Sequence, residues 1–182
     1  MPSFRRPEDT QRRSNLRTIL ALMRRMRHAG AAILLLATAA CQQLPTTASV
    51  AIPSIPAGEA RVWFYRSLDI YDSLNTPYIR MNDAIVAISQ PGGASYRDVP
   101  AGQYHIKVDS FLDDPRQDQN VSLVPGQELY VKIVPLRDWI QGGGGGDPGG
   151  GGGSYGRDTF YVWLIPPETA RADVARSAFY GG

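Results

Sequence analysis

The chain has 182 residues, of which 43% are apolar and 20% are charged, and this composition suits one globular domain. The net charge of +2 hides a segregation: residues 1–40 carry eight arginines and two carboxylates, whereas residues 41–182 carry eleven basic and fifteen acidic side chains. Because the larger part is mildly acidic and has no basic patch with interleaved aromatic residues, we exclude a nucleic-acid partner.

The first 40 residues are typical of an export leader. A basic stretch at 24–28 precedes an apolar run at 29–37, which is too short to span a bilayer. Small side chains at 38–40 then precede Cys41, and this arrangement resembles the lipobox of bacterial lipoproteins. The sequence therefore predicts that residues 1–40 are a lipoprotein signal peptide, disordered in the folded protein, and that Cys41 carries lipid.

Cys41 is the only cysteine, so it cannot form an internal disulfide, and a free thiol is unusual in an exported protein. This favours lipidation over the alternative, an ordinary secretory signal with a chance cysteine. Met23 and Met26 are alternative start residues that would give a leader of more usual length. Gln42 follows the cysteine, and by resemblance to enterobacterial lipoproteins this predicts the outer membrane, with the domain facing the periplasm.

The next segment reads as a spacer. Residues 42–58 contain three prolines and no charge, a composition that does not bury a core. The sequence therefore predicts that residues 41–58 are the lipidated cysteine and a flexible tether, long enough to hold the domain tens of ångströms from the bilayer.

Strand and turn patterns follow from residue 59 onward. Short β-rich segments alternate with turns such as Asn82-Asp83, Pro100-Ala101-Gly102 and Pro125-Gly126. We expect a mainly β fold for residues 59–182: a single antiparallel β-sandwich of about seven short strands, immunoglobulin- or transthyretin-like. The expected strand segments are 60–67, 78–82, 84–89, 95–99, 103–111, 120–124, 128–135 and 159–165.

Two segments depart from the strand pattern. Residues 141–156 contain two runs of five glycines around Asp147-Pro148 and predict a flexible insertion. Residues 167–180 predict a C-terminal helix, because Pro167 suits the first turn and Glu168 complements the N-terminal end of the helix dipole. We expect this helix to dock beside the last strand.

The first and last strands are apolar on both faces, although a strand with one face in water would alternate. Their aromatic residues therefore need cover, either from the C-terminal helix or from a partner. If a partner supplies it, the candidate interaction surface consists of Trp63, Tyr65, Trp139, Tyr161 and Trp163.

Catalytic and metal signatures are weak. His105 is the only histidine after the leader, and no serine elbow or zinc ligand set accompanies it. Asp109, Asp113, Asp114 and Asp118 crowd one loop, which leaves calcium open as an alternative to a solvated acidic loop. We expect no catalytic residues, no resident metal and no cofactor, and hence no enzyme activity.

Four segments resemble known modules. They are ARVWFYR at 60–66, YIRMNDAIVAI at 78–88, SYRDVPAGQYHIKV at 95–108 and PGQELYVKI at 125–133. Together they resemble a bacterial lipoprotein family known only as a domain of unknown function, and they are similar to PEGA-like β-sandwich surface modules. The resemblance covers roughly residues 59–136. It implies an exported, non-enzymatic sandwich on a lipid anchor and assigns no functional residues.

Two functions from different classes follow. The first is a lipid-anchored cell-envelope protein whose sandwich binds another envelope component, through an aromatic patch or by strand addition at a free sheet edge. The alternative is a carbohydrate-binding module for peptidoglycan or a surface polysaccharide, which requires exposed aromatic residues beside polar groups.

Overall fold

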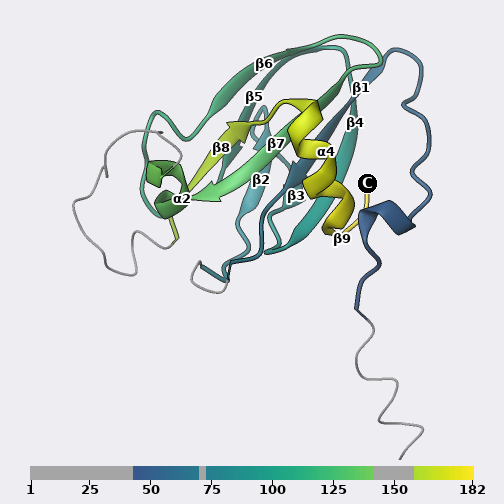
Figure 1. The fold of residues 1–182 in the computed structure, drawn as a ribbon. Coiled ribbons are helices and arrows are strands. Elements are labelled where there is room, and N and C mark those ends of the chain that lie inside the picture. Colours follow the sequence, from purple (N-terminus) through teal and green to yellow (C-terminus); the bar gives the residue numbers. More distant parts are fainter. Residues whose placement is uncertain (1–42, 70–72, 142–157) are drawn as a thin grey trace, which may run out of the picture. The chain divides into compact units, whose positions relative to one another are not determined.

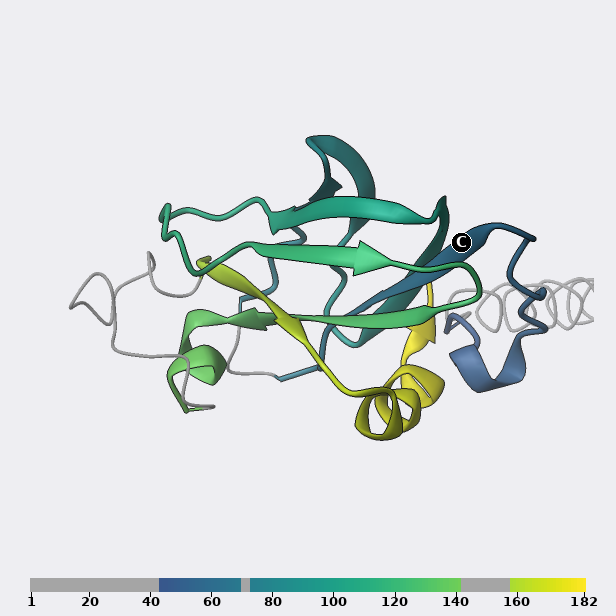
Figure 2. The ribbon, with the colours of Figure 1, turned by 90° about the horizontal axis from the view of Figure 1, so that it is seen from above.

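Two stacked β-sheets form the body of the molecule, with a helix on the outer face of one sheet (Figures 1 and 2). The computed structural model describes residues 43–69, 73–141 and 158–182, and Leu44–Gly182 form one compact unit. The described elements in chain order are η1 (Thr47–Ser49), β1 (Glu59–Tyr65), β2 (Tyr78–Met81), β3 (Ala84–Ile88), β4 (Gly93–Pro100), β5 (Gly102–Val108), β6 (Gln119–Leu123), β7 (Glu128–Pro135), α2 (Leu136–Gln141), β8 (Phe160–Leu164), α4 (Pro167–Arg176) and β9 (Ala178–Phe179).

The expected mainly β sandwich is confirmed, but its strands differ in number and direction from the prediction. Sheet one has the order β8-β7-β1-β4-β9 and sheet two the order β3-β2-β5-β6, which gives nine strands in the described ranges instead of about seven. Sheet one is mixed rather than antiparallel, because β1 pairs with β7 in parallel and β4 pairs with β9 in parallel. The remaining pairs are antiparallel.

The turns explain this topology. Asn82 and Asp83 both have positive φ, 47° and 65°, which matches the two-residue turn that joins tightly paired strands, and β2–β3 is the expected hairpin. The turn at residues 100–102 and the turn at Pro125-Gly126 instead connect strands of different sheets, β4 to β5 and β6 to β7. They are corners of the sandwich, so β7 enters sheet one beside β1.

The core between the sheets comes from alternate residues of each strand. Val62 and Phe64 of β1 are buried and face sheet two, where they meet residues such as Ile79 of β2 and Ile106 of β5. Each of these four side chains is at most 2% exposed. This confirms that β1 directs Val62 and Phe64 to one face and its aromatic neighbours to the other.

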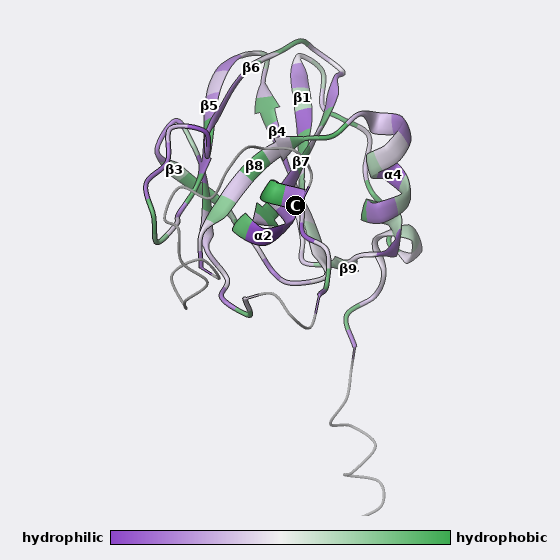
Figure 3. Ribbon diagram, turned by 60° about the vertical axis from the view of Figure 1, so that its left-hand side comes forward, coloured by the Kyte–Doolittle hydropathy of each residue, from purple (hydrophilic) through white to green (hydrophobic). Residues whose placement is uncertain are grey.

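The outer face of sheet one is covered by α4. Ala170 and Val174 are the buried residues of this helix and pack on the aromatic cluster of β1 and β7. Figure 2 shows α4 below sheet one, on the side away from sheet two, and Figure 3 shows that much of its remaining surface is hydrophilic. The expected helix over 167–180 is too long, because Ser177 is extended and the chain continues as β9.

The segment before β1 is packed on the domain, in contrast to the flexible tether expected for 41–58. Thr47 donates from its backbone N–H to the Ser177 carbonyl at 2.8 Å, and Phe179 donates to the Pro45 carbonyl at 2.8 Å. Arg61 donates to the Pro53 carbonyl at 2.8 Å. The segment is rich in proline and has no strand or helix pattern, but backbone hydrogen bonds to β9 and its flanks fix it on the domain.

A short helix was not expected between β7 and the glycine-rich insertion. Leu136 begins α2 and is buried with Val134 and Tyr161 in a separate apolar cluster on the outer side of β7 and β8. The leader at 1–40, Cys41 and residues 142–156 of the expected insertion lie outside the described residues.

Candidate functional site

The first part of the predicted aromatic surface is a buried cluster. Trp63 and Tyr65 are only 4% and 3% exposed, because α4 covers them. Trp63 donates from its indole nitrogen to Glu128 at 3.3 Å, and Arg171 of α4 donates to the same carboxylate at 3.2 Å. Arg171 also donates to the Tyr130 hydroxyl at 3.3 Å. Helix α4, rather than a partner protein, therefore covers the aromatic side chains on the outer face of β1.

The second part of that surface is a partly buried cluster. Tyr161 is fully buried, and its ring stacks on Trp139 with centroids 4.5 Å apart and planes 5° apart. Trp163 meets Trp139 edge-on at 5.7 Å. The buried Tyr161 ring is therefore closed to a sugar ring, whereas Trp139 and Trp163 are half-buried beside it. The five aromatic residues therefore do not form one exposed surface, which corrects the prediction.

The other sequence candidates are engaged within the fold. His105 lies 3.0 Å from the Asp118 carboxylate on the outer side of sheet two. The Asp114 carboxylate is buried and accepts hydrogen bonds from Arg116 and the Tyr161 hydroxyl. Across residues 43–69, 73–141 and 158–182, no three His, Cys, Asp or Glu side chains are grouped to hold a metal ion. Within the same ranges, no helix has the length and apolar character needed to cross a membrane.

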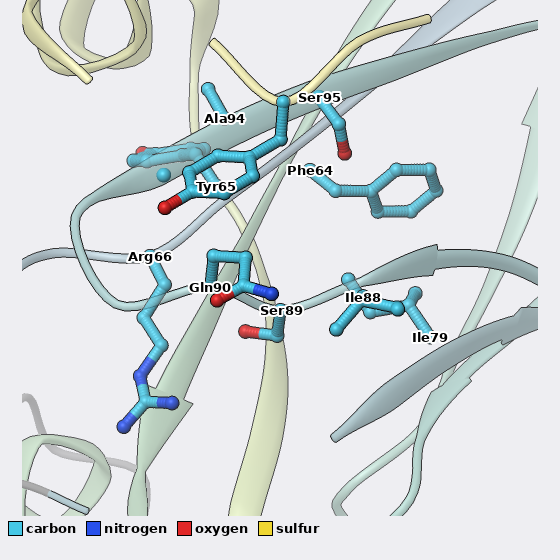
Figure 4. Close-up of a pocket in the computed structure, with 11 residues that line it drawn as sticks. Phe64, Tyr65, Arg66, Ile79, Ile88, Ser89, Gln90, Ala94 and Ser95 are labelled. Carbon is cyan, nitrogen blue, oxygen red and sulfur yellow. The ribbon is translucent and has the colours of Figure 1, made fainter. Parts of the chain in front are cut away.

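A small cavity of about 10 Å³ lies beside the end of β1 (Figure 4). The Phe64 and Ile88 side chains lie on one side of it, and the Tyr65 and Ser89 hydroxyls on the other. Both hydroxyls are buried without a hydrogen-bond partner, and burial raises the pKa of Tyr65 above its usual value. The volume suits one water molecule, so this cavity is not a substrate site.

A larger hollow of about 380 Å³ opens along β3, and we call it the β3 groove. This volume falls within the range of small-ligand sites. Its walls are β3 and the first part of β4 on one side and the chain after β9 on the other. Four large apolar side chains that line it are 45% to 53% exposed, which is unusual for their type. They are Tyr78, Ile85, Ile88 and Tyr180.

A bulge in β3 places two of these side chains on the same side. Ile85 and Ile88 are three residues apart and would point to opposite faces of a regular strand. The register between β2 and β3 shifts at Ile79 and Arg80, so Ile85 opposes Arg80 whereas Ala87 opposes Ile79. Both isoleucines therefore line the groove, and Ala87 stays in the core.

The far wall of the groove depends on small residues. Tyr180 donates its backbone N–H to the Ala94 carbonyl at 2.9 Å, which continues the alignment of β9 along β4. The Tyr180 ring lies so close to Gly93 that a Cβ atom at Gly93 would be 2.7 Å from it. Gly93 thus gives Tyr180 its position in the groove.

The β3 groove has a free strand edge and a single cation. β3 pairs with β2 on one side and has no strand partner on its other side in the described part of the chain. Arg97 of β4 reaches across, and its Nε donates to the Val86 carbonyl at 2.7 Å. None of the ion pairs among the described residues includes Arg97.

Sequence reasoning named strand addition at a free edge but did not locate the edge. The apolar run at residues 84–88 marks β3 as a strand of a hairpin, which says nothing about its partners on the other side. The sequence feature that marks this edge is the apolar pair Ile85 and Ile88 close to a two-residue turn. The hairpin that contains them lies at the edge of sheet two.

Comparisons with known proteins yield similar solved structures but no family. No protein-family model and no curated protein sequence matches the chain. A solved structure of the N-terminal domain of AlgF from P. aeruginosa is similar at 20% sequence identity, over 61% of this chain and 98% of that one, with a TM-score of 0.32.

Proposed function

We propose that this protein is a non-enzymatic, lipid-anchored envelope lipoprotein whose β-sandwich binds another envelope component through the β3 groove. The observation that carries the binding role is the groove itself: four exposed apolar side chains beside an unpaired strand edge. Soluble domains usually protect such edges, and an unprotected one is a common place for strand addition.

The anchor rests on the leader pattern and on Cys41. We propose that the domain faces the periplasm from the outer membrane. The resemblance to a lipoprotein domain family and to PEGA-like modules supports this proposal, and the two-sheet architecture agrees with that resemblance. We also propose that the sandwich has an immunoglobulin- or transthyretin-like topology.

The anchor is tested by intact mass spectrometry of protein extracted from membranes of its native host. The expected mass is that of residues 41–182 plus a diacylglycerol and one acyl chain. Cys41→Ser should abolish this modification and leave the protein unprocessed or released from the membrane, because several buried acyl chains hold a lipoprotein effectively permanently. An unmodified native protein, or membrane retention of Cys41→Ser, would contradict the anchor.

The binding role is tested by a photo-crosslinking amino acid at Ile85, with Ser122 as the matched control. Both positions are exposed on sheet two, but Ser122 lies on β6, the opposite edge strand. In cells, Ile85 should give a discrete crosslinked product that is identified by mass spectrometry and confirmed from the partner's side. Equal crosslinking from both positions would mean that the groove binds nothing specific.

A carbohydrate ligand is the second candidate, because Tyr78 and Tyr180 are both close to half exposed and line the same groove. Retention of the protein on purified cell wall or polysaccharide, lost in Tyr180→Ala, would favour it. No retention of either protein would remove it.

A further inference from the structure

We propose that the β3 groove recognises an extended peptide segment that carries a carboxylate, with the carboxylate paired to Arg97 and the peptide backbone added to the edge of β3. This inference deepens the proposed function and rests on it, since it names the chemistry of the partner at the same site.

The shape of the groove favours an extended chain. One wall is a strand without a second neighbour, and the other is the chain that continues β9 along β4. This second wall ends in Gly181 and Gly182, which have no side chains to fill the space between the walls. A strand fits between two such walls because its backbone groups can bond to an edge while its side chains alternate outward.

The exposed apolar residues fit a peptide with apolar side chains. The β3 bulge brings Ile85 and Ile88 to the groove side, and Tyr78, directly opposite Ile88 in the register, extends the same surface. Burial of such side chains stabilises a complex by about 25 cal/mol per Å² of apolar surface removed from water, before the cost of ordering the peptide. Apolar contact therefore supplies affinity but little selectivity.

The charge of the groove supplies the selectivity. Other arginines on the strands pair with carboxylates: Arg61 lies 2.7 Å from Asp98, and Arg80 lies 2.8 Å from Asp109. Arg97 has no carboxylate partner among the described residues, although it is exposed and its Nε donates to the Val86 carbonyl. That bond holds the guanidinium at the groove wall, and the two Nη atoms are suited to a carboxylate, which a guanidinium binds in a bidentate manner.

The hydrogen bond from Arg97 to the Val86 carbonyl also occupies the middle of the free edge of β3. Because Arg97 occupies the Val86 carbonyl, an added strand would bond on either side of Val86, next to Ile85 and Ile88. The carboxylate at Arg97 would then set the register of the peptide, since a one-residue slip would move it to the opposite face.

The inference is tested with a displayed library of random linear peptides, selected on the full lipid-free domain. We expect the selected sequences to share an aspartate or glutamate flanked by apolar residues, and to compete with crosslinking from Ile85. Arg97→Gln should weaken binding of the selected peptides by about tenfold or more, the effect of losing a charge-assisted hydrogen bond. Arg176→Gln is the matched control, because Arg176 is also exposed but lies on α4.

Two further variants make the result decisive. Arg97→Glu should reverse the charge preference, so that peptides with lysine in place of the acidic residue bind better than the original ones. Methylation of alternate backbone nitrogens in a selected peptide should reduce its affinity if the backbone adds to β3, whereas methylation of the intervening nitrogens should not.

The outcomes separate the two proposals. Peptides that bind the groove with equal affinity to the protein and to Arg97→Gln would overturn the carboxylate but leave the groove as a binding site. Failure to select peptides together with retention on polysaccharide would overturn the peptide and favour the carbohydrate candidate. Failure to select peptides together with no specific crosslink from Ile85 would overturn the proposed function itself.

Discussion

At the scale of single residues, Asp114 shows how an acidic loop becomes a structural unit. Its carboxylate accepts bonds from the Arg116 guanidinium at 2.6 Å and from the Tyr161 hydroxyl at 3.0 Å. The Arg116 side chain, more than any other group, holds the pKa of Asp114 down at about 2. The sequence favoured a solvated acidic loop and left a calcium site open as the alternative, but the burial of Asp114 against Arg116 could not be deduced from the spacing of the aspartates.

Asp114→Asn should therefore lower the free energy of unfolding at pH 7 by about 1 kcal/mol, a modest value because solvent screens the exposed Arg116 partner. The folded protein lowers the pKa of Asp114 below its usual 3.8, so the pair stabilises the fold above that pH and this stabilisation is lost as the pH falls toward about 2. Urea denaturation between neutral and acidic pH should show the difference from the native protein narrowing over that interval. Asp113→Asn, at the exposed neighbour, should have no such effect. A pH-independent difference would exclude the linkage.

At the scale of elements, the sequence identified the strands better than their connections. β1, β5 and β7 were predicted because alternation or β-rich composition is a local property, and the β2–β3 hairpin because Asn82-Asp83 favours positive φ. The corner turns were not distinguished from hairpins, since Pro and Gly bend the chain in the same way whether the next strand joins the same sheet or the facing one. The helix α2 was missed because six residues carry too little periodicity.

Helix α4 acts as the cover of the aromatic cluster, and its packing can be tested. Ala170 is fully buried, so Ala170→Glu would bring a charge against Trp63 and Tyr65. We expect a loss of about 3 kcal/mol in the free energy of unfolding, or detachment of the helix with a red shift in tryptophan fluorescence and dye binding to the exposed face. Thr169→Glu, one residue earlier and exposed, is the control and should change neither signal. Equal effects of both substitutions would mean that α4 does not pack as described.

At the scale of the molecule, the segment before β1 and the segment after α4 are held together by hydrogen bonds. Thr47 bonds to the Ser177 carbonyl through both its backbone nitrogen and its hydroxyl, and Thr46 bridges to Ala178. Ile52 packs against the same apolar cluster as α4. Neither segment has a pattern that predicts this contact, because prolines interrupt the apolar residues of the first and the second is only six residues long.

We expect a chain that begins at Ser54 to be less stable than one that begins at Gln43, by about 2 kcal/mol or more, because it lacks these bonds and leaves the buried Arg61 without the Pro53 carbonyl. Thr47→Val should account for about 1 kcal/mol of this, through loss of the hydroxyl bond alone. Both values follow from urea denaturation monitored by tryptophan fluorescence. Identical denaturation midpoints for the two chains would show that the segment is not part of the folded unit.

This joining of the two segments sets the height of the domain above the lipid. In the proposed mature protein the acylated residue is Cys41, and Pro45 already bonds to Phe179. Four residues span at most about 14 Å when fully extended. The module would therefore sit directly on the headgroups with little freedom to tumble. Its partners would have to be membrane-embedded or membrane-adjacent proteins, because a ligand deep in the periplasm would lie beyond its reach.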